Sequence, residues 1–561
     1  MHPDTFLVGD NVLLVGEGNF SFAVGLTDWN LPITITASCL GSDNVIKTRE
    51  ENIAYLKEKG VRVLLGVDAT KLDEHFVLRT EKFSKIIFNF PHIGGKMKIH
   101  LNRALLKGFF QTASKLVTLD GRILVSLCKG QGGTRVDKPI RRWDDTWQVV
   151  EMAAHGELVL VSVEKFRNDM IPKYTSVGYR GGDSAFDTDG ALVHVFSKRE
   201  PLYPSMDMET LLQHLESQVL ETKFGNLVCN SVYHIKYRNN PLEREGSAMH
   251  YLSEQLKSFV ETLCIKVRHI SDDNVPLHTE LAIGSPLCYT EGHKVECSLR
   301  HTLFDVLDEV LKLWNQAHDE IIMFPGLIFN DLGVDFSYPP LSCHVLLLGD
   351  ELSGVTEKCI RRMLQVFQKG AMYISVSAFE MAAECHHRIT ADKNIFIKNV
   401  TQTKVPVKVA QEFSLTVEGS GESRCISASV IHLDRLSELL FDVDNWRQLW
   451  TQESCVVFDK NIPFLNHSCF ESLAYTCDIS FLESPSFSSA KFCAILWQVA
   501  GDIIINVEFL NMYQSPDGWR SHCYRITYQS FDKALSRKQA SRIQEAIIGK
   551  VLCAKLGISI R

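Results

Sequence analysis

The chain has 561 residues, of which 45% are apolar and 22% charged, and its formal net charge at pH 7 is −8. These values are typical of a globular protein, argue against a surface coated in positive potential, and leave room for about three or four domains. Its sixteen cysteines form no C-x-x-C pair, and no run of about eighteen apolar residues would span a membrane. We therefore expect a reduced, soluble protein of the cytoplasm, nucleus or nucleolus, with mitochondria less favoured.

The first 200 residues alternate short apolar runs with helical stretches. The runs lie at 12–15, 33–37, 61–65, 85–90, 122–127, 158–163 and 191–196, and we expect helices near 20–28, 45–58, 70–79, 99–118 and 143–154. Repeated β-α-β order demands a parallel sheet with helices on both faces. The seventh run follows the sixth after a long loop and no obvious helix. This α/β pattern predicts a class I, Rossmann-like methyltransferase domain over residues 1–200.

In such a sheet a ligand lies beyond the carboxyl ends of the strands. The first run leads into GEGNFSF (16–22), whose glycines let the backbone approach a ligand before a helix begins near Ser21. The second run ends at Ser38, where a polar group can hold a ribose hydroxyl, and the third leads to Asp68, which can accept from an adenine amino group. Taken alone, the glycines fit an ordinary turn and Asp68 fits a helix cap. Together they predict a nucleoside-containing cofactor. NAD comes second because the usual acidic residue after a dinucleotide site's second strand is missing.

The fourth run ends in FNFPHIGG (88–95), which offers an amide, an aromatic ring, a proline and an imidazole at Asn89, Phe90, Pro91 and His92. Asn89 has donors and an acceptor for a base edge, and the ring of Phe90 offers a stacking face. The imidazole of His92 can act as a base toward an imide N–H, and the two glycines leave room for a flipped base. The alternative is that Phe90 is core and His92 braces the next helix.

Five segments of the sequence resemble a known family. LLVGEGNFSFA, VDAT, FNFPHIGG, HLNRALLKGFFQTASKLV and GRILVSL together resemble the rRNA uridine-N3 methyltransferases, over about residues 8–198. The resemblance implies S-adenosylmethionine as cofactor, its methionine end at Gly16, Glu17, Gly18 and Phe20, its adenine side at Asp68, and the target base at Asn89 to His92. The chain departs from the family at Ser38-Cys-Leu-Gly and at VGYRGGDSAF (177–186). Both departures bear on the substrate more than on the fold.

The last 94 residues, 468–561, are predicted to form a ferredoxin-like α+β domain. Apolar runs at 478–481, 492–496 and 503–510 alternate with helical stretches, followed by a strand at 522–531, a helix over about 536–556 and a strand at 557–561. The segment from Trp519 onward resembles the ferredoxin-fold anticodon-binding (FDX-ACB) domain that ends phenylalanyl-tRNA synthetases, which implies RNA binding. Residues 515–561 hold nine Lys and Arg against three Asp and Glu. The basic candidates for RNA contact are Arg520, Arg525, Lys533, Arg537 and Lys538. Tyr524 and Tyr528 can stack on bases only if they face outward; the alternative is that they are buried.

The middle region, 201–467, carries fewer signals. A helix is expected over 298–316, and VEGSGESR (417–424) reads as a loop or local hairpin. Residues 433–458 resemble the end of a mitochondrial-type phenylalanyl-tRNA synthetase core, an α+β fold. ASVIHLDR keeps Arg435 but lacks the glycines of the ATP-binding motif, so side chains should block ATP. We expect an inactive synthetase-like module that extends an RNA surface, or else an unrelated domain.

The joined modules resemble the animal family of ferredoxin-fold anticodon-binding-domain-containing proteins. The sequence thus predicts an S-adenosylmethionine-dependent RNA methyltransferase acting on a base nitrogen, uridine N3 favoured, of tRNA or rRNA, with no metal, no membrane and no identified protein partner. The second hypothesis is a non-catalytic RNA-binding adaptor whose methyltransferase fold has lost turnover. Intact GEGNFSF, VDAT and NFPH favour the enzyme. Active aminoacylation is disfavoured by the missing glycines.

Overall fold

The computed structural model describes most of the chain. Outside the described residues lie 1, 42–46, 95–97, 178–184, 200–209, 211–212, 214–218, 223–224, 229–231, 234–235, 237–238, 264–265, 271–276, 279–286, 291–295, 308–309, 312–319, 351, 353, 379–387, 400–404, 419–422, 452–455, 460–461 and 466–471. The chain forms two compact units. One holds Met1–Ser205, Asn466–Tyr475 and Gln529–Arg542, and the other Met206–Leu465, Thr476–Tyr528 and Ile543–Arg561.

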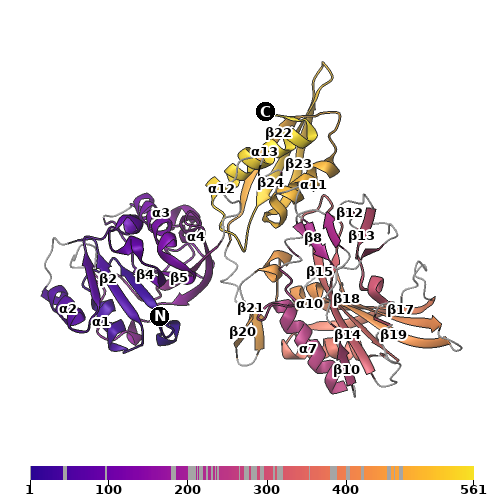
Figure 1. The fold of residues 1–561 in the computed structure, drawn as a ribbon, viewed down its shortest axis with the longest axis horizontal. Coiled ribbons are helices and arrows are strands. Elements are labelled where there is room, and N and C mark those ends of the chain that lie inside the picture. The colour runs from indigo at the N-terminus through magenta and orange to yellow at the C-terminus, as the bar shows by residue number, and fades with distance from the viewer. Residues whose placement is uncertain are drawn as a thin grey trace. The chain divides into compact units, whose positions relative to one another are not determined.

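A seven-stranded sheet forms the N-terminal region, in the order β3-β2-β1-β4-β5-β7-β6 (Figure 1). Its strands are β1 Asn11–Val15, β2 Thr34–Cys39, β3 Arg62–Leu65, β4 Phe83–Asn89, β5 Val117–Leu127, β6 Leu158–Lys165 and β7 Leu192–Lys198. Strands β1 to β5 pair in parallel, whereas β7 runs antiparallel to both β5 and β6. This confirms the predicted class I methyltransferase-like fold, including the antiparallel return of the last strand.

Helices cover both faces of this sheet because its strands are apolar on both sides. The helices are α1 Ser21–Asp28, α2 Lys47–Glu58, α3 Ile99–Leu116 and α4 Val149–Ala154. Along β1, Val12 and Leu14 pack in one core with residues of α1, while Leu13 and Val15 pack in a second core with residues of α3 and α4. The period of two along the strand thus divides the core into two layers.

Two predicted helices differ from the structure. The stretch 70–79 forms only 3₁₀ turns, η2 Ala69–Glu74 and η3 Leu78–Thr80, because Lys71 leaves the helical region at φ −137°. The stretch 143–154 is divided into a 3₁₀ turn, η4 Trp143–Asp145, and α4. Gln148 separates the two in the left-handed conformation, at φ 53°. Further 3₁₀ turns are η1 Pro3–Thr5 and η5 Asn168–Met170.

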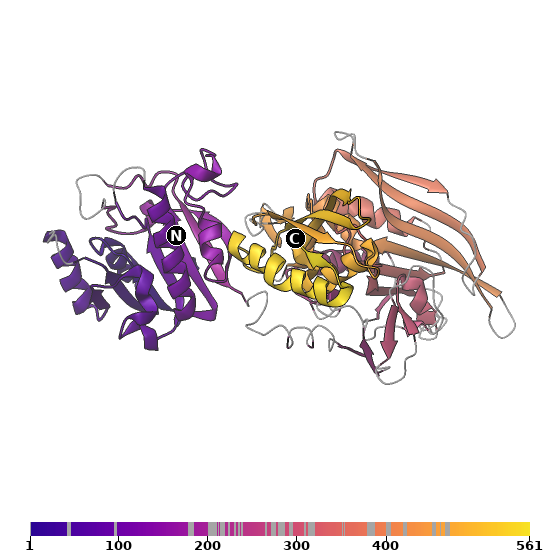
Figure 2. The same ribbon diagram turned by 90° about the horizontal axis from the view of Figure 1, so that it is seen from above.

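The middle region is built on a second seven-stranded sheet, ordered β10-β14-β15-β19-β18-β17-β16, whose long strands lie side by side in Figure 2. Its strands are β10 Lys266–His269, β14 Glu320–Phe329, β15 Leu341–Gly349, β16 Met372–Ala378, β17 Arg388–Asn399, β18 Val407–Glu418 and β19 Ser423–His432. All neighbours pair antiparallel except β10 with β14. An antiparallel sheet with helices on it fits the predicted α+β class.

The remaining elements of this region are smaller. Its helices and 3₁₀ turns are α7 Ala248–Leu263, η7 Leu303–Val306, α9 Val355–Val366, α10 Leu433–Leu440 and η8 Trp446–Trp450. A five-stranded sheet holds β8 Val219–Thr222, β9 Gly225–Val228, β11 Leu277–His278, β12 Leu287–Thr290 and β13 Glu296–Leu299. A two-stranded sheet holds β20 Val456–Asp459 and β21 Ile462–Leu465. Of the helix expected over 298–316, residues 298 and 299 instead end β13, Leu303–Val306 form the 3₁₀ turn η7, and residues 308–309 and 312–316 lie outside the described residues. Residues 417–424 join the hairpin β18–β19, with 419–422 outside the described residues.

A four-stranded antiparallel sheet, ordered β23-β24-β22-β25, forms the C-terminal domain. Its elements are β22 Tyr475–Leu482, α11 Ser489–Ala500, η10 Gly501–Ile503, β23 Ile504–Gln514, β24 Arg520–Tyr528, α12 Arg537–Arg542, the π-helical turn η11 Ile543–Ile548, α13 Gly549–Leu556 and β25 Ser559–Ile560. The ferredoxin-like prediction is confirmed, although the run 492–496 is helical. Tyr524 and Tyr528 are only 6% and 0% exposed, so they belong to the buried face. Among the described residues, no helix has the length and apolar character needed to cross a membrane.

Candidate functional site at the strand ends

The switch point of the first sheet lies between β1 and β4. From β1 the chain passes through α1 to β2 on one side, whereas β4 leads through α3 to β5 on the other. Val15 and Phe88 are register partners at the ends of these two strands, so the loops starting at Gly16 and Asn89 emerge side by side. Ligands of open α/β sheets bind at such a point. Of the four predicted ligand-binding loops, the structure therefore places the one after β1 and the one after β4 next to each other at the switch point.

Strained backbone marks both loops. Gly16 has φ +72°, and a Cβ there would lie 2.4 Å from Cε2 of Phe88, so only glycine fits. Phe20 and Phe90, neither of them glycine, are also left-handed, at φ 62° and 50°. Residues held in this region cost free energy of order 1–3 kcal/mol and cluster at functional sites. Two such outliers on neighbouring strand ends support a site here.

Glu17 is a buried carboxyl group, 7% exposed, in the loop between β1 and α1. Its Oε2 accepts a hydrogen bond from the Ala23 N–H at 3.3 Å. Burial raises the pKa of Glu17 to about 7, although the Ala23 N–H partly offsets this rise. A buried carboxylate is costly unless a cation or several donors compensate it. A ligand that brings positive charge to this position would therefore be stabilised.

The segment 174–177 covers the glycine-rich loop. A Cβ on Gly18 would lie 2.4 Å from Cγ2 of Val177. The side chain of Val177, and not only a ligand, therefore requires a glycine at this position. Thr175 accepts from Asn19 Nδ2 at 2.8 Å and exchanges backbone hydrogen bonds with the Ser21 hydroxyl at 2.9 and 3.0 Å. These contacts explain Gly18 by internal packing; contact with a cofactor stays a prediction.

Ser38 and Asp68 have internal partners as well. The Ser38 hydroxyl is fully buried and donates to the Leu14 carbonyl at 2.9 Å, within the sheet. The Asp68 carboxylate accepts from the N–H and the hydroxyl of Thr70, at 2.8 and 2.7 Å, and so caps η2. Asp68 thus performs the capping role that the sequence left open. A carboxylate has further acceptor positions, so its proposed adenine contact is compatible with the cap.

The loop after β4 is held in place from two sides. The Ser126 hydroxyl on β5 donates to Asn89 Oδ1 at 2.6 Å, and the Phe90 N–H donates to the Ser126 carbonyl at 2.9 Å. On the other side, Asn102 of α3 accepts from the Ile93 N–H at 3.1 Å. Pro91 is buried within the same loop. The amide of Asn89 is consequently fixed in one orientation.

Aromatic rings surround this loop. Phe90 is buried and stacks on Phe186 with a centroid distance of 5.8 Å and an interplanar angle of 16°. The His92 ring lies 5.8 Å from that of Trp147 and 5.9 Å from that of Phe186. Burial lowers the pKa of His92, which favours its neutral form. Of the expected Gly94 and Gly95 pair, Gly95 lies outside the described residues.

Sequence reasoning missed several residues of this site, above all Ser126, Asn102, Trp147, Thr175 and Phe186. Ser126 is a polar residue in the apolar end of β5, and Asn102 is a polar residue on the buried face of α3. A buried polar residue usually has a partner, so that signal was readable. Nothing in the sequence placed Trp147 and Phe186 beside His92, because these residues are more than fifty positions away.

The predicted RNA-contact residues differ in their exposure and in whether they already form ion pairs. Arg525 forms a two-bond ion pair with Asp478, at 2.8 and 2.9 Å, and Arg520 lies 3.6 Å from Glu483. Lys533 is half-buried, whereas Arg537 and Lys538 are exposed at the start of α12. The exposed residues are better placed for phosphate contact than the paired Arg525.

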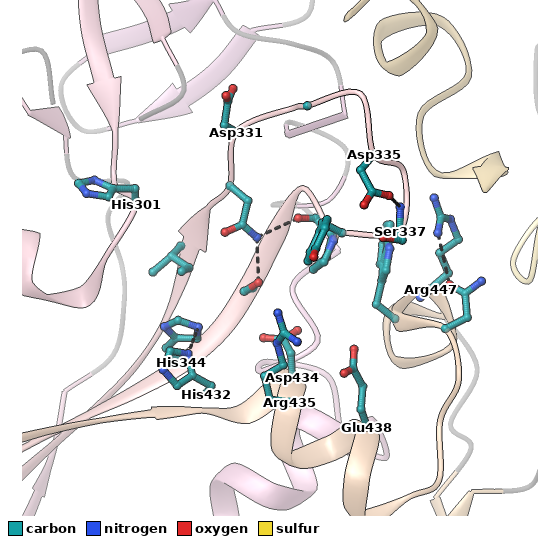
Figure 3. A pocket seen from close by; sticks show the side chains of 18 of the residues that line it. His301, Asp331, Asp335, Ser337, His344, His432, Asp434, Arg435, Glu438 and Arg447 are labelled. Atoms are coloured by element: carbon teal, nitrogen blue, oxygen red, sulfur yellow. Dashed lines mark hydrogen bonds between the residues drawn. The ribbon is translucent and has the colours of Figure 1, made fainter. Parts of the chain in front are cut away.

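A cavity of about 1050 Å³ lies in the synthetase-like region (Figure 3). Five acidic residues and two arginines line it: Asp331, Asp335, Asp434, Glu438, Asp444, Arg435 and Arg447. Figure 3 shows Glu438 pointing from α10 toward the loop that carries Asp335. The guanidinium of Arg447 is buried and donates to the carbonyls of Phe336, Ile504 and Asp502. Within the described part of the chain, no group of three or more His, Cys, Asp or Glu side chains is arranged to hold a metal ion.

Bulky side chains line part of the cavity. His432 Nδ1 lies 3.0 Å from His344 Nε2, and Val430 is a further lining residue. Burial lowers the pKa of His432 to about 4, so this pair is neutral. Asp434 is 4% exposed, accepts from the Cys343 N–H, and burial raises its pKa to about 8. These side chains stand where the sequence lacks the glycines of an ATP site.

Together these features define a chain with a methyltransferase-like N-terminal domain, a synthetase-like middle region and a ferredoxin-like C-terminal domain. Residues 13–178 match the BMT5-like family, described as rRNA (uridine-N3-)-methyltransferase BTM5-like. The chain is similar, over 95% of its length and 97% of the relative's, to ferredoxin-fold anticodon-binding domain-containing protein 1 of Homo sapiens, with 28% identity. The resemblance expected from the sequence is confirmed.

Two further relatives cover parts of the chain. Heavy metal-associated isoprenylated plant protein 41 of Arabidopsis thaliana is 36% identical over 174 residues, 29% of this chain and 32% of its own. Mitochondrial phenylalanine–tRNA ligase of Mus musculus is 29% identical over 143 residues, 24% of this chain and 32% of its own. Among solved structures, TrmN from Thermus thermophilus covers 34% of this chain and 45% of its own, with 15% identity and a TM-score of 0.22.

Proposed function

We propose that this protein is an S-adenosylmethionine-dependent RNA methyltransferase that acts on a base nitrogen, with uridine N3 favoured, of tRNA or rRNA. The observation that carries the proposal is the pairing, at one switch point, of a buried carboxyl group on the first loop with an oriented amide on the fourth. The family match over residues 13–178 supports the same reaction. In this proposal rRNA processing is the wider role of the methyltransferase-like domain.

The residues of the first loop suit the cofactor. S-adenosylmethionine carries a sulfonium and an ammonium group, and Glu17 is a buried carboxyl group that lacks a described cationic partner. The start of α1 offers backbone N–H groups to the cofactor's carboxylate. We assign the methionine end to Gly16, Glu17, Gly18 and Phe20, and the ribose and adenine to Ser38 and Asp68. When bound, the cofactor supplies an electrophilic methyl group.

The loop after β4 would receive the target base. Asn89 supplies an oriented amide, and the aromatic rings around His92 provide apolar walls for a planar heterocycle. Holding base and cofactor at one switch point supplies much of the rate, because positioning converts a bimolecular reaction into one within a complex. The C-terminal domain would grip the RNA through exposed basic side chains such as Arg537 and Lys538. We further propose the cytoplasm or nucleus, nucleolus included, as the compartment, with mitochondria as the alternative.

The competing proposal is a non-catalytic RNA-binding adaptor. One observation favours it: the spaces beside Gly16 and Gly18 are already occupied by Phe88 and Val177 of the chain itself. Binding of the cofactor would then require the segment 174–177 to move. The two proposals differ in one measurable property, the affinity for S-adenosylmethionine.

Calorimetric titration with S-adenosylmethionine tests the proposal. We expect binding that Asp68→Ala weakens, whereas Asp73→Ala, on the same 3₁₀ turn but paired with Lys115 at 2.7 Å, leaves it unchanged. Thermal unfolding of both variants checks that the turn remains folded. No binding up to millimolar cofactor, with or without added tRNA or rRNA, would favour the adaptor.

Salt-dependent RNA binding tests the C-terminal surface. We expect Lys538→Ala to reduce the slope of log affinity against log salt by about one, because one phosphate contact is lost. Arg525→Ala should change it less, since Asp478 already neutralises that guanidinium. Equal slopes in both variants and the native chain would place the RNA elsewhere.

A further inference from the structure

The protonation of His92 follows from one hydrogen bond. The Gly94 N–H donates to His92 Nδ1 at 2.6 Å. A backbone N–H can only donate, so Nδ1 must accept through its lone pair. A neutral imidazole has one protonated and one unprotonated nitrogen, so the proton of neutral His92 sits on Nε2. The neighbouring Ile93 N–H is held by Asn102 of α3, which keeps this short loop in place.

The neutral form is the one that the surroundings favour. Burial lowers the pKa of His92, so the imidazole is uncharged at neutral pH. Its single basic lone pair is then engaged by Gly94. In this state His92 acts toward a ligand as a donor through Nε2–H and cannot accept a proton there. This geometry argues for a role different from that of the general base expected from the sequence.

Asn89 supplies a second donor. Its Oδ1 accepts from the Ser126 hydroxyl at 2.6 Å, which assigns the other amide atom as Nδ2. Nδ2 is buried and has no hydrogen-bond partner among the described residues. An unsatisfied buried donor costs about 1–3 kcal/mol, so an acceptor brought by a ligand would relieve that cost.

Resting on the proposed function, we propose that His92 Nε2–H and Asn89 Nδ2–H are paired donors that recognise the carbonyl oxygens flanking an imide nitrogen of the target base. Both carbonyl oxygens gain negative charge when the imide proton leaves, and N–H donors stabilise that charge. A base that presents an amino group at this edge would set donor against donor. The site thus selects uracil-type bases over cytosine and adenine.

The reaction balances without a base on the protein. The imide N–H loses its proton to solvent water or hydroxide, and the resulting anion is held by the two donors. Its nitrogen lone pair forms the new N–C bond as the methyl–sulfur bond breaks and that electron pair remains on sulfur. The sulfonium becomes a neutral thioether, and the imide nitrogen becomes N-methylated. His92 keeps its proton throughout.

Two substitutions at His92 separate a donor from a base. Glutamine can place an amide N–H near the position of Nε2 but cannot act as a base at neutral pH, and alanine offers neither. With uridine-containing RNA, we expect His92→Gln to keep methyl transfer within about tenfold of the native rate, while His92→Ala loses about a hundredfold. Equal loss in both variants, with a native pH–rate inflection between about 6 and 7, would overturn the proposal.

A second measurement does not need turnover. In the full chain with ¹⁵N-labelled histidine rings, His92→Gln identifies the His92 signals by their disappearance. We expect a protonated Nε2 and an unprotonated Nδ1 throughout pH 6.5–8; a protonated Nδ1 or a charged ring at pH 7 would overturn the proposal. Absence of S-adenosylmethionine binding would defeat the proposed function instead, while the ring signals would still decide the protonation of His92.

Discussion

The strand-end site of the first sheet and the cavity of the synthetase-like sheet offer opposite chemistry to a ligand. In the recognition proposed above, the first offers N–H donors from Asn89 and His92, and the buried carboxyl group Glu17 lies on the loop after the neighbouring strand β1. The second presents five acidic side chains, and of its two arginines Arg447 is committed to backbone carbonyls. Although burial keeps Asp434 largely protonated at neutral pH, we expect the remaining acidic side chains to disfavour a nucleotide triphosphate, because clefts concentrate the field of their charges.

The comparison shows that two sheets of the same chain can carry quite different residues beside their strands. In the methyltransferase-like domain, Gly16, Phe20 and Phe90 at the switch point have left-handed backbone conformations. In the synthetase-like region, the side chains of Val430 and His432 line the cavity, in the segment ASVIHLDR that lacks glycines. Function resides in the residues at the site and not in the fold that carries them.

The largest effect is expected from Asn89→Ala. Removing an oriented donor that stabilises a developing anion costs about 10²–10³ in rate. We expect methyl transfer to fall by that factor, with cofactor affinity within about threefold of the native value, in single-turnover assays with saturating cofactor. The matched variant in the cavity, Asp434→Asn, should leave transfer unchanged. Equal loss in both variants would show that the two regions act together.

A pH-dependent effect on stability is expected from Glu17→Gln. Because burial raises the pKa of Glu17 to about 7 from 4.5, the native state holds a proton between these values that the unfolded chain has released. Stability therefore falls as pH rises through this window, by up to about 3 kcal/mol at about 1.4 kcal/mol per unit. Urea unfolding at pH 5 and pH 8 should show that the native chain loses about this much more unfolding free energy between the two pH values than Glu17→Gln does.

The cavity provides the comparison for this experiment. Burial also raises the pKa of Asp434, to about 8, so Asp434→Asn should show the same sign of pH dependence. Added S-adenosylmethionine should flatten the loss of stability due to Glu17, since its positive charge stabilises the ionised carboxylate, and should leave that due to Asp434 unchanged. If the cofactor changed neither contribution, Glu17 would not be part of its site.

A smaller effect is expected from Ser126→Ala. This variant removes the hydroxyl that orients the Asn89 amide, a neutral hydrogen bond that contributes about 0.5–1.5 kcal/mol. We expect the preference for uridine over cytidine RNA, measured as a ratio of transfer rates, to fall by about threefold to tenfold. The variant Ser114→Ala, which removes a hydroxyl bonded within α3, is the control. An unchanged ratio would show that Ser126 only fills space.

No effect at all is expected from ATP. Amino-acid-dependent ATP–pyrophosphate exchange should be absent, because acidic side chains and the His344–His432 pair line the cavity. Calorimetry should likewise detect no ATP binding at millimolar concentration. Exchange above that of a heat-inactivated control would remove the distinction drawn between the two regions and restore aminoacylation as a function.

The order of elements was readable from the sequence wherever local signals agreed. Short apolar runs and long amphipathic stretches predicted the fold class of the N-terminal and C-terminal domains, because few arrangements of strands and helices bury all of these apolar faces. The prediction failed where local backbone preferences competed, as at Lys71, which breaks the predicted helix 70–79. The stretch 492–496 was mistaken for a strand-like run because a short apolar segment on a buried helix has no distinguishing period.

The residue types at the strand ends can be read from the sequence, because Glu17, Asn89 and His92 follow apolar runs that must be buried. The roles of their individual atoms depend on the folded structure. The hydrogen bond from Gly94 assigns the His92 proton, and that from Ser126 orients the Asn89 amide. Neither hydrogen bond can be read from the sequence, because its direction depends on atoms brought together by β-strand register and loop geometry.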